Sequence, residues 1–177
     1  LGTRARKTRT KSFNAFSSID YPETAVFRDM RLIPFLRRPD PMPPVQFYEQ
    51  LDPAVFVLRL VPGMRADIIP LLAPHYRALV VESFGVGGLP GGEHGEMYAR
   101  LQDWCTSGRL AVFNTQVPHE GCDLAVYEVG RSVKELPGVL EAKDMTPEAV
   151  AVKLMWALGQ TTDRAEAMRL FTTPVEW

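Results

Sequence analysis

Three short runs of apolar, largely β-branched residues follow one another in the second half of the sequence. They are VFVLRLV (55–61), ALVVESFG (78–85) and LAVFNTQV (110–117). Runs of this length that end near glycine, proline or polar residues are typical of strands buried inside a sheet. The pattern therefore predicts three strands in this part of the chain.

Between these runs, apolar residues recur with helical spacing. In segment 95–109 the positions i, i+4, i+7 and i+8 are filled by Met97, Leu101, Trp104 and Cys105, which places them on one helical face. Segment 66–78, ADIIPLLAPHYRA, has a helical pattern that its prolines interrupt. We expect an amphipathic helix at 95–109 and a broken one at 66–78.

Two more helices are predicted near the end of the chain. Thr146 followed by Pro147 supplies an N-cap and a first helical residue. The helix that follows has an apolar face made of Val150, Leu154, Ala157 and Leu158. Segment 163–171 predicts a last short helix with Asp163 as its cap.

Strands that alternate with helices indicate an α/β fold, with a mostly parallel sheet and helices on both of its faces. Five prolines stand between residues 31 and 44: Pro34, Pro39, Pro41, Pro43 and Pro44. We therefore expect a C-terminal α/β domain at 53–177, preceded by a proline-rich linker at 31–52. Residues 1–30 are too few to bury a core alone, and we expect them to be the end of a larger N-terminal domain.

Composition removes several classes of function. The chain has 177 residues, two cysteines, three histidines and a formal net charge of −1, which argue against a disulfide scaffold, a metal site and a polyanion binder. Apolar runs are too short to cross a bilayer. We expect a soluble protein of a reducing, cytoplasmic compartment, with neither nucleic acid nor membrane as partner.

Two polar or glycine-rich loops follow predicted strands, where ligands bind in open α/β sheets. The first, ESFGVGGLPGG (82–92), fails both common phosphate-binding patterns, because Pro90 and Glu93 stand where glycine and lysine are needed. It is either a ligand loop or a plain turn. In the second, NTQVPHEGCDLAVYEVG (114–130), His119 and Glu120 form an acid–base pair or lie apart on the surface.

Single residues add further expectations. Cys105 belongs to a helix's apolar face and should pack in the core, whereas Cys122 lies in a polar loop and could be exposed. In the opening run RARKTRTKSF (4–13), alternation places Arg4 and Arg6 on one side of an extended strand and Lys7 on the other. Lys7 is either solvated or a group that transfers protons.

Taken together, four stretches resemble the type I, cytoplasmic-type L-asparaginases. They are GTRARKTRTKSFNAFSSIDYP (2–22), LVVESFGVGGLP (79–90), FNTQVPHEGCDLAVYEVG (113–130) and EAKDMTPEAVAVKLMWAL (141–158). Their order and spacing fit that family over essentially the whole chain. The resemblance implies that the chain is the C-terminal portion of such a protein, with the end of its larger N-terminal α/β domain in front.

The resemblance also implies site residues. Arg4-Ala5-Arg6-Lys7-Thr8 is similar to a family segment whose lysine joins a threonine and an aspartate in proton transfer, so Lys7 is the catalytic candidate. The threonine nucleophile and the threonine–aspartate pair would lie outside these 177 residues. The substrate-binding or intersubunit loop residues would be Ser83, Gly85, Gly87, Gly88 and Tyr127, although members often have asparagine where Gly88 stands.

The implied activity is hydrolysis of L-asparagine to L-aspartate and ammonia through a threonyl ester, without metal or organic cofactor. The family resemblance implies a homodimer or a homotetramer. One alternative is the asparaginase-like subunit of a tRNA-dependent amidotransferase. Another is a non-catalytic assembly domain, if the chain begins at Leu1.

Overall fold

A four-stranded parallel sheet forms the centre of the chain. The computed structural model describes residues 2–36, 44, 46–91 and 95–174. The strands are β5 (Val55–Arg59), β6 (Ala78–Ser83), β7 (Leu110–Thr115) and β8 (Val139–Glu141), and they lie side by side in that order. Every neighbouring pair is parallel, so the α/β fold predicted from the alternation of strands and helices is confirmed.

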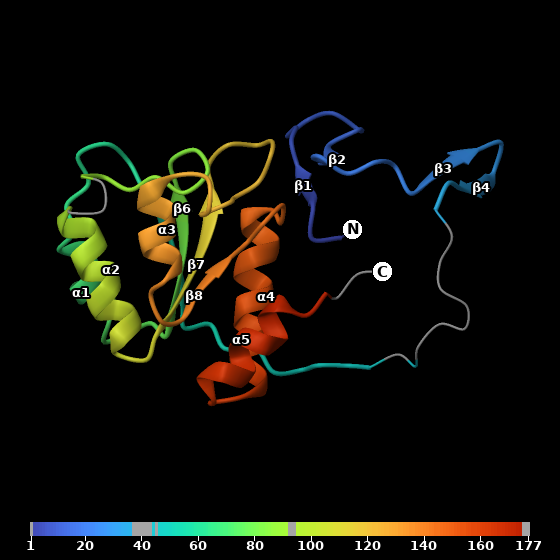
Figure 1. Cartoon of the computed structure of the whole chain (residues 1–177). Helices are drawn as coiled ribbons and strands as arrows, with labels where there is room; N and C mark the ends of the chain where they lie inside the picture. Colours follow the sequence, from blue (N-terminus) through green and yellow to red (C-terminus); the bar gives the residue numbers. More distant parts are fainter. Residues whose placement is uncertain (1, 37–43, 45, 92–94, 175–177) are drawn as a thin grey trace.

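Helices cover both faces of this sheet (Figure 1). On one face lie α1 (Ile68–Leu72), α2 (Glu96–Thr106) and α3 (Glu128–Lys134), and on the other lie α4 (Pro147–Gln160) and α5 (Arg164–Thr172). Successive strand residues point to opposite faces. Within β6, Leu79 therefore packs toward α2, whereas its neighbour Val80 packs toward α4.

The two longest helices bury the faces that the sequence predicts. The buried residues of α2 are Met97, Leu101, Trp104 and Cys105, and those of α4 are Val150, Leu154, Ala157 and Leu158. Both predicted caps form, because the Thr146 side chain accepts a hydrogen bond from the Ala149 amide and the Asp163 side chain accepts one from the Glu166 amide. No helix in the described part of the chain is long and apolar enough to span a membrane.

Within the α/β domain, strand β8 and helix α3 were not predicted, and α1 is shorter than expected. Strand β8 has three residues at the sheet edge, and helix α3 buries only Gly130 and Val133, so neither has a clear periodic pattern. In α3, a Cβ on Gly130 would lie 2.3 Å from the Leu124 carbonyl oxygen, so this glycine permits close packing of the helix. Within the predicted broken helix 66–78, only the five residues of α1 are α-helical.

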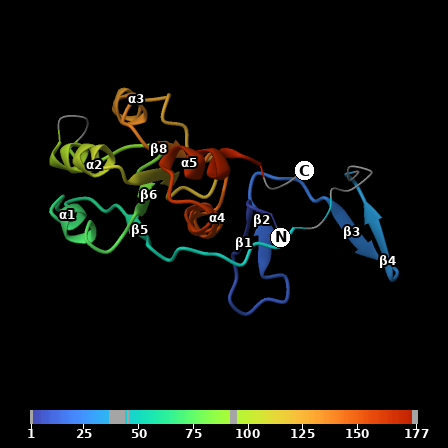
Figure 2. The same ribbon diagram turned by 90° about the horizontal axis from the view of Figure 1, so that it is seen from below.

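The first part of the chain forms two hairpins. Strand β1 (Ala5–Lys7) pairs with β2 (Phe16–Ser18), and β3 (Ala25–Arg28) pairs with β4 (Arg31–Pro34), both antiparallel. Figures 1 and 2 show the second hairpin farther from the central sheet than the first. Residues 31–34, which the sequence assigned to the linker, thus form a strand, and the isolated two-stranded hairpin accommodates Pro34 at its edge.

The end of the predicted linker packs against α4. The ring of Tyr48 meets that of Trp156 edge-on, with the ring centroids 5.3 Å apart. The Asp52 amide donates a hydrogen bond to the Met155 carbonyl at 2.9 Å. Residues 37–43 and 45 of this predicted linker lie outside the described residues.

Candidate active-site edge

Buried polar residues gather at the carboxyl ends of β6 and β7. Glu82, Ser83, Asn114 and Thr115 are each at most 7% exposed. In the parallel pairing Ser83 lies opposite Thr115, so all four belong to one edge of the sheet. Polar groups are costly to bury without partners, and this edge is therefore a candidate for function rather than for packing.

Hydrogen bonds tie these strand ends together. The Ser83 hydroxyl donates to the Asn114 carbonyl at 2.7 Å, and the Thr115 hydroxyl donates to the Gly85 carbonyl at 2.5 Å. The Gln116 side-chain amide, through Nε2, donates to the Leu60 and Glu82 backbone carbonyls at 2.7 and 2.8 Å. The candidate Ser83 hydroxyl thus bonds to the backbone and holds neighbouring strands in place.

The glycine-rich loop after β6 is a tight turn. Phe84 and Gly88 exchange backbone hydrogen bonds of 2.7 and 3.1 Å. Gly85 has a φ of +50° and Gly87 one of +150°, and a Cβ on Gly87 would lie only 2.5 Å from Leu124 Cδ2. Glycine at position 87 therefore lets the loop pack directly on the loop that precedes α3.

Tyr127, the remaining candidate of the loops, lies at the N-cap position of α3. Tyr127 is 61% exposed, and its backbone carbonyl accepts a hydrogen bond from the Arg131 amide at 3.0 Å. The phenol is therefore available to a ligand or a neighbouring protein. Ser83 and the Gly85 carbonyl, by contrast, take part in the hydrogen bonds that join the strand ends.

The N-terminal segment is joined to this edge through its basic residues. Arg4 Nε lies 2.5 Å from Asp144 Oδ2, and Arg6 Nη2 lies 2.9 Å from Glu148 Oε1, at the first turn of α4. Both arginines lie on one side of the extended segment, as the alternation predicted. Lys7, the next residue, is exposed, and in the part of the chain that the structure describes no hydrogen bond reaches its ammonium group.

Asp20 makes a second connection between the N-terminal segment and the C-terminal domain. Its Oδ1 lies 2.9 Å from His119 Nδ1, and its Oδ2 accepts a hydrogen bond from the Glu120 amide at 2.6 Å. These two hydrogen bonds lower the pKa of Asp20. His119 is 69% exposed at its side chain, so it lies at the surface and its partner is Asp20 rather than Glu120.

A small cavity lies beneath these contacts. It measures about 30 Å³ and is lined by Arg6, Asp20, Asn114 and Thr115, among others. That is room for about two water molecules. Asn114 Nδ2 is buried without a hydrogen-bond partner among the described residues. Asn114 was not among the site residues expected from the sequence, although it begins the polar segment 114–130 that follows a predicted strand.

Both cysteines are buried. Cys105 is fully buried as expected, but Cys122 is only 2% exposed and its Sγ lies 3.5 Å from the Val86 carbonyl. Burial raises the pKa of Cys105 to about 11 and that of Cys122 to about 12. The expectation of an exposed Cys122 is wrong, because the fold covers its polar loop with the loop after β6.

The described residues contain no group of three or more histidine, cysteine, aspartate or glutamate side chains that could hold a metal ion. Comparison with known protein families identifies the family of the chain. Residues 54–171 match the model of the glutaminase/asparaginase C-terminal domain.

The chain belongs to the glutaminase/asparaginase family. It is 36% identical over 174 residues to an L-asparaginase of Thermococcus kodakarensis, covering 96% of this chain and 51% of that protein. It is 34% identical over 179 residues to the D subunit of the glutamyl-tRNA(Gln) amidotransferase of Metallosphaera sedula, covering 97% of this chain and 39% of that protein.

Solved structures agree with this placement. The thermostable L-asparaginase from Thermococcus kodakarensis superposes with a TM-score of 0.87 at 34% identity, over 97% of this chain and 52% of that one. The asparaginase-family chain thus spans about half the length of the L-asparaginase that it resembles, and it matches the C-terminal portion.

Proposed function

We propose that this chain is the C-terminal part of an L-asparaginase, which hydrolyses L-asparagine to L-aspartate and ammonia. The observation that carries the proposal is the 36% identity to an L-asparaginase over nearly the whole chain, from the N-terminal segment through the domain. The protein would be cytoplasmic and would act as a homodimer or a homotetramer, without a metal or an organic cofactor.

The reaction would proceed in two steps. A threonine hydroxyl of the N-terminal domain attacks the side-chain amide carbon of asparagine, and ammonia leaves after it receives a proton. Water then attacks the threonyl ester, which releases aspartate and restores the hydroxyl. The oxyanion formed in each step would be stabilised by amide donors of the same N-terminal domain.

Lys7 would take part in proton transfer: the attacking threonine hydroxyl loses a proton, and the leaving ammonia needs one. It is the last residue of β1, and the ion pairs of Arg4 and Arg6 hold that strand against Asp144 and Glu148. With those two arginines on one side, alternation directs Lys7 to the other side, away from α4. A threonine–aspartate pair of the N-terminal domain would surround it there.

The loop after β6 would face the active site of a neighbouring subunit. Its tight turn at Phe84–Gly88 presents backbone groups, and the Thr115 bond to Gly85 fixes their position. Because Gly88 has no side chain to reach across, contacts from this loop would come from its backbone, and Tyr127 would add an exposed phenol. Asn114, buried behind the loop, would support this arrangement.

The test compares three full-length proteins that contain this chain: wild type, Lys7→Met and Lys11→Met. Loss of a general acid–base group typically lowers the rate about 10²- to 10⁴-fold, so we expect that drop in ammonia release for Lys7→Met alone. Lys11 is exposed in the same segment and serves as the matched control. Equal rates in all three proteins would contradict the role of Lys7.

A second candidate is the asparaginase-like subunit of a tRNA-dependent amidotransferase. It is favoured by the 34% identity to the Metallosphaera sedula protein, which also extends over 97% of this chain. Such a subunit would deliver ammonia to a partner that acts on aminoacylated tRNA. Turnover of free asparagine by the isolated protein would argue against it, whereas co-purification with a partner subunit and tRNA would favour it.

A further inference from the structure

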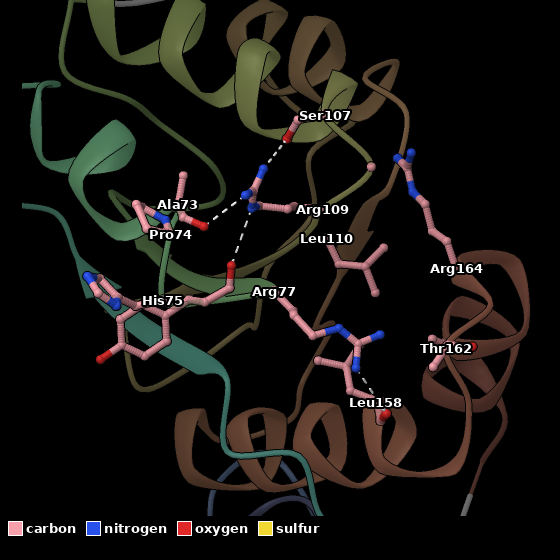
Figure 3. Close-up of a pocket in the computed structure, with 13 residues that line it drawn as sticks. Ala73, Pro74, His75, Arg77, Ser107, Arg109, Leu110, Leu158, Thr162 and Arg164 are labelled. Atoms are coloured by element: carbon pink, nitrogen blue, oxygen red, sulfur yellow. Dashed lines mark hydrogen bonds between the residues drawn. The ribbon is translucent and has the colours of Figure 1, made fainter.

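A second cavity lies at the opposite end of the sheet from the candidate active-site edge. It measures about 380 Å³, and its lining includes Arg77 and Arg109, the residues immediately before β6 and β7, and Arg164, the first residue of α5. Figure 3 shows these side chains around the cavity. The six residues of β6 separate the two ends by about 20 Å, so the cavity is distinct from the candidate active site.

Arg109 is held rigidly in this lining. Its guanidinium donates to the Ala73 carbonyl at 2.8 Å, to the Tyr76 carbonyl at 3.3 Å and to the Ser107 hydroxyl at 2.6 Å (Figure 3). All three acceptors are neutral, so the positive charge of Arg109 stays uncompensated by them. The position of the charge is fixed before any ligand arrives.

Arg77 is only partly engaged. Its Nη1 lies 2.5 Å from Asp52 Oδ2 and 3.4 Å from the Leu158 carbonyl oxygen. Both bonds use the same nitrogen, and no hydrogen bond among the described residues uses its Nη2. Arg77 can therefore keep its ion pair with Asp52 and still donate to a ligand.

Arg164 is the third arginine of the lining. Its Nε and Nη2 are buried without a hydrogen-bond partner among the described residues. A Cβ on Gly138 would lie 2.0 Å from Arg164 Nη2, so the guanidinium packs flat against this glycine. Arg164 as a whole is only partly buried, and its guanidinium adds a positive charge to the cavity lining.

The lining contains no carboxylate to neutralise these groups. Three arginines and His75 line the cavity, and none of its described lining residues is aspartate or glutamate. Asp52, outside the lining, forms an ion pair with Arg77. The volume lies within the range typical of small-molecule sites, and guanidinium groups match the oxygen geometry of phosphate.

We propose that this cavity binds the phosphate group of a small molecule, with Arg77, Arg109 and Arg164 as its positive charges. The site is separate from the proposed hydrolysis and does not depend on it. Its position at the amino ends of the strands makes it a second site on the same domain.

The test titrates the full-length protein with inorganic phosphate, using isothermal calorimetry and thermal unfolding. We expect one phosphate per chain and a rise in the unfolding temperature, while sodium chloride of equal ionic strength gives neither. Loss of a charged hydrogen bond corresponds to about tenfold or more in affinity, so Arg164→Gln should weaken phosphate binding by at least that factor.

Arg169→Gln is the matched control. Arg169 belongs to the same helix, pairs with Glu166 at 2.7 Å and does not line the cavity, so its loss should leave phosphate affinity unchanged. In phosphate-free buffer, Arg164→Gln should unfold at the wild-type temperature or above, because no described residue accepts a hydrogen bond from Arg164 Nε or Nη2. Absence of phosphate binding to wild type, equal weakening by both variants, or a marked loss of stability of Arg164→Gln without phosphate would overturn the proposal.

Discussion

Asp20 Oδ1 lies 2.9 Å from His119 Nδ1, a contact between residues 99 positions apart in the sequence. Asp20 follows strand β2, whose partner β1 ends with Lys7, and His119 lies in the loop that follows β7. The contact therefore helps to fix the segment that contains the proposed catalytic lysine on the carboxyl edge of the sheet.

The Asp20 contact should make stability depend on pH. Hydrogen bonds from His119 and the Glu120 amide lower the pKa of Asp20 below its ordinary value of 3.8. A group whose pKa is lowered by folding stabilises the fold above its unfolded pKa and loses that contribution as the pH falls through its folded pKa. Asp20→Asn should thus be less stable than wild type at about pH 6, and the difference should shrink by about pH 3.

Chemical denaturation at both pH values measures this difference. Glu23→Gln is the control, since Glu23 is an exposed acid of the same segment, and it should match wild type at both. A constant difference between Asp20→Asn and wild type across the range would contradict the ionic origin of the contact.

Gly87→Ala should destabilise the fold by about 1–3 kcal/mol, the usual cost of overpacking. The new methyl group would lie 2.5 Å from Leu124 Cδ2. Gly63→Ala is the comparison, because Gly63 has a φ of +80°, against +150° for Gly87, and nothing lies within 4 Å of its Cβ position. Urea unfolding should show a larger loss for Gly87→Ala, and equal losses would mean that the contact with Leu124 adds no cost.

Glu141→Gln should cost about 2 kcal/mol, because the carboxylate accepts several charged or buried hydrogen bonds. Lys143 and Lys134 pair with it, the latter at 3.2 Å, and the Leu124 amide donates to it at 3.0 Å. Burial opposes ionisation of Glu141, but these hydrogen bonds outweigh it and hold the pKa below the ordinary 4.5.

The stability that Glu141 provides should therefore be present near neutral pH and be lost as the pH falls below about 4. Glu135→Gln, which alters an exposed acid at the end of α3, should change stability by less than about 0.5 kcal/mol. Thermal or urea unfolding of both variants measures the contrast, and similar losses would show that Glu141 is no more important than a surface acid.

Both thiols should be almost unreactive in the folded protein. Burial raises the pKa of Cys105 to about 11 and that of Cys122 to about 12, and the thiolate is the reactive form. Titration with a thiol reagent at about pH 8 should label neither residue in the native state and both after unfolding in denaturant. Rapid labelling of native Cys122 would show that the loops covering it open readily.

Local patterns determined much of the fold. The buried faces of α2 and α4, the caps at Thr146 and Asp163, and three of the four sheet strands follow from residues close together in sequence. The spacing of apolar residues and the capping side chains both act within a single helix or strand. They can therefore be recognised from the sequence alone. The sequence blocks that indicate the asparaginase family were equally local.

Only the tertiary structure shows which side chains from distant parts of the sequence pair with one another. Arg6 meets Glu148 across 142 residues and Asp20 meets His119 across 99, and Cys122 is buried because the loop after β6 covers it. The edge strand β8 and the helix α3 lack a repeating pattern, so only packing on their neighbours stabilises them. Burial and charge pairing between distant segments depend on how the elements pack in space, whereas periodicity records only which face of an element is apolar.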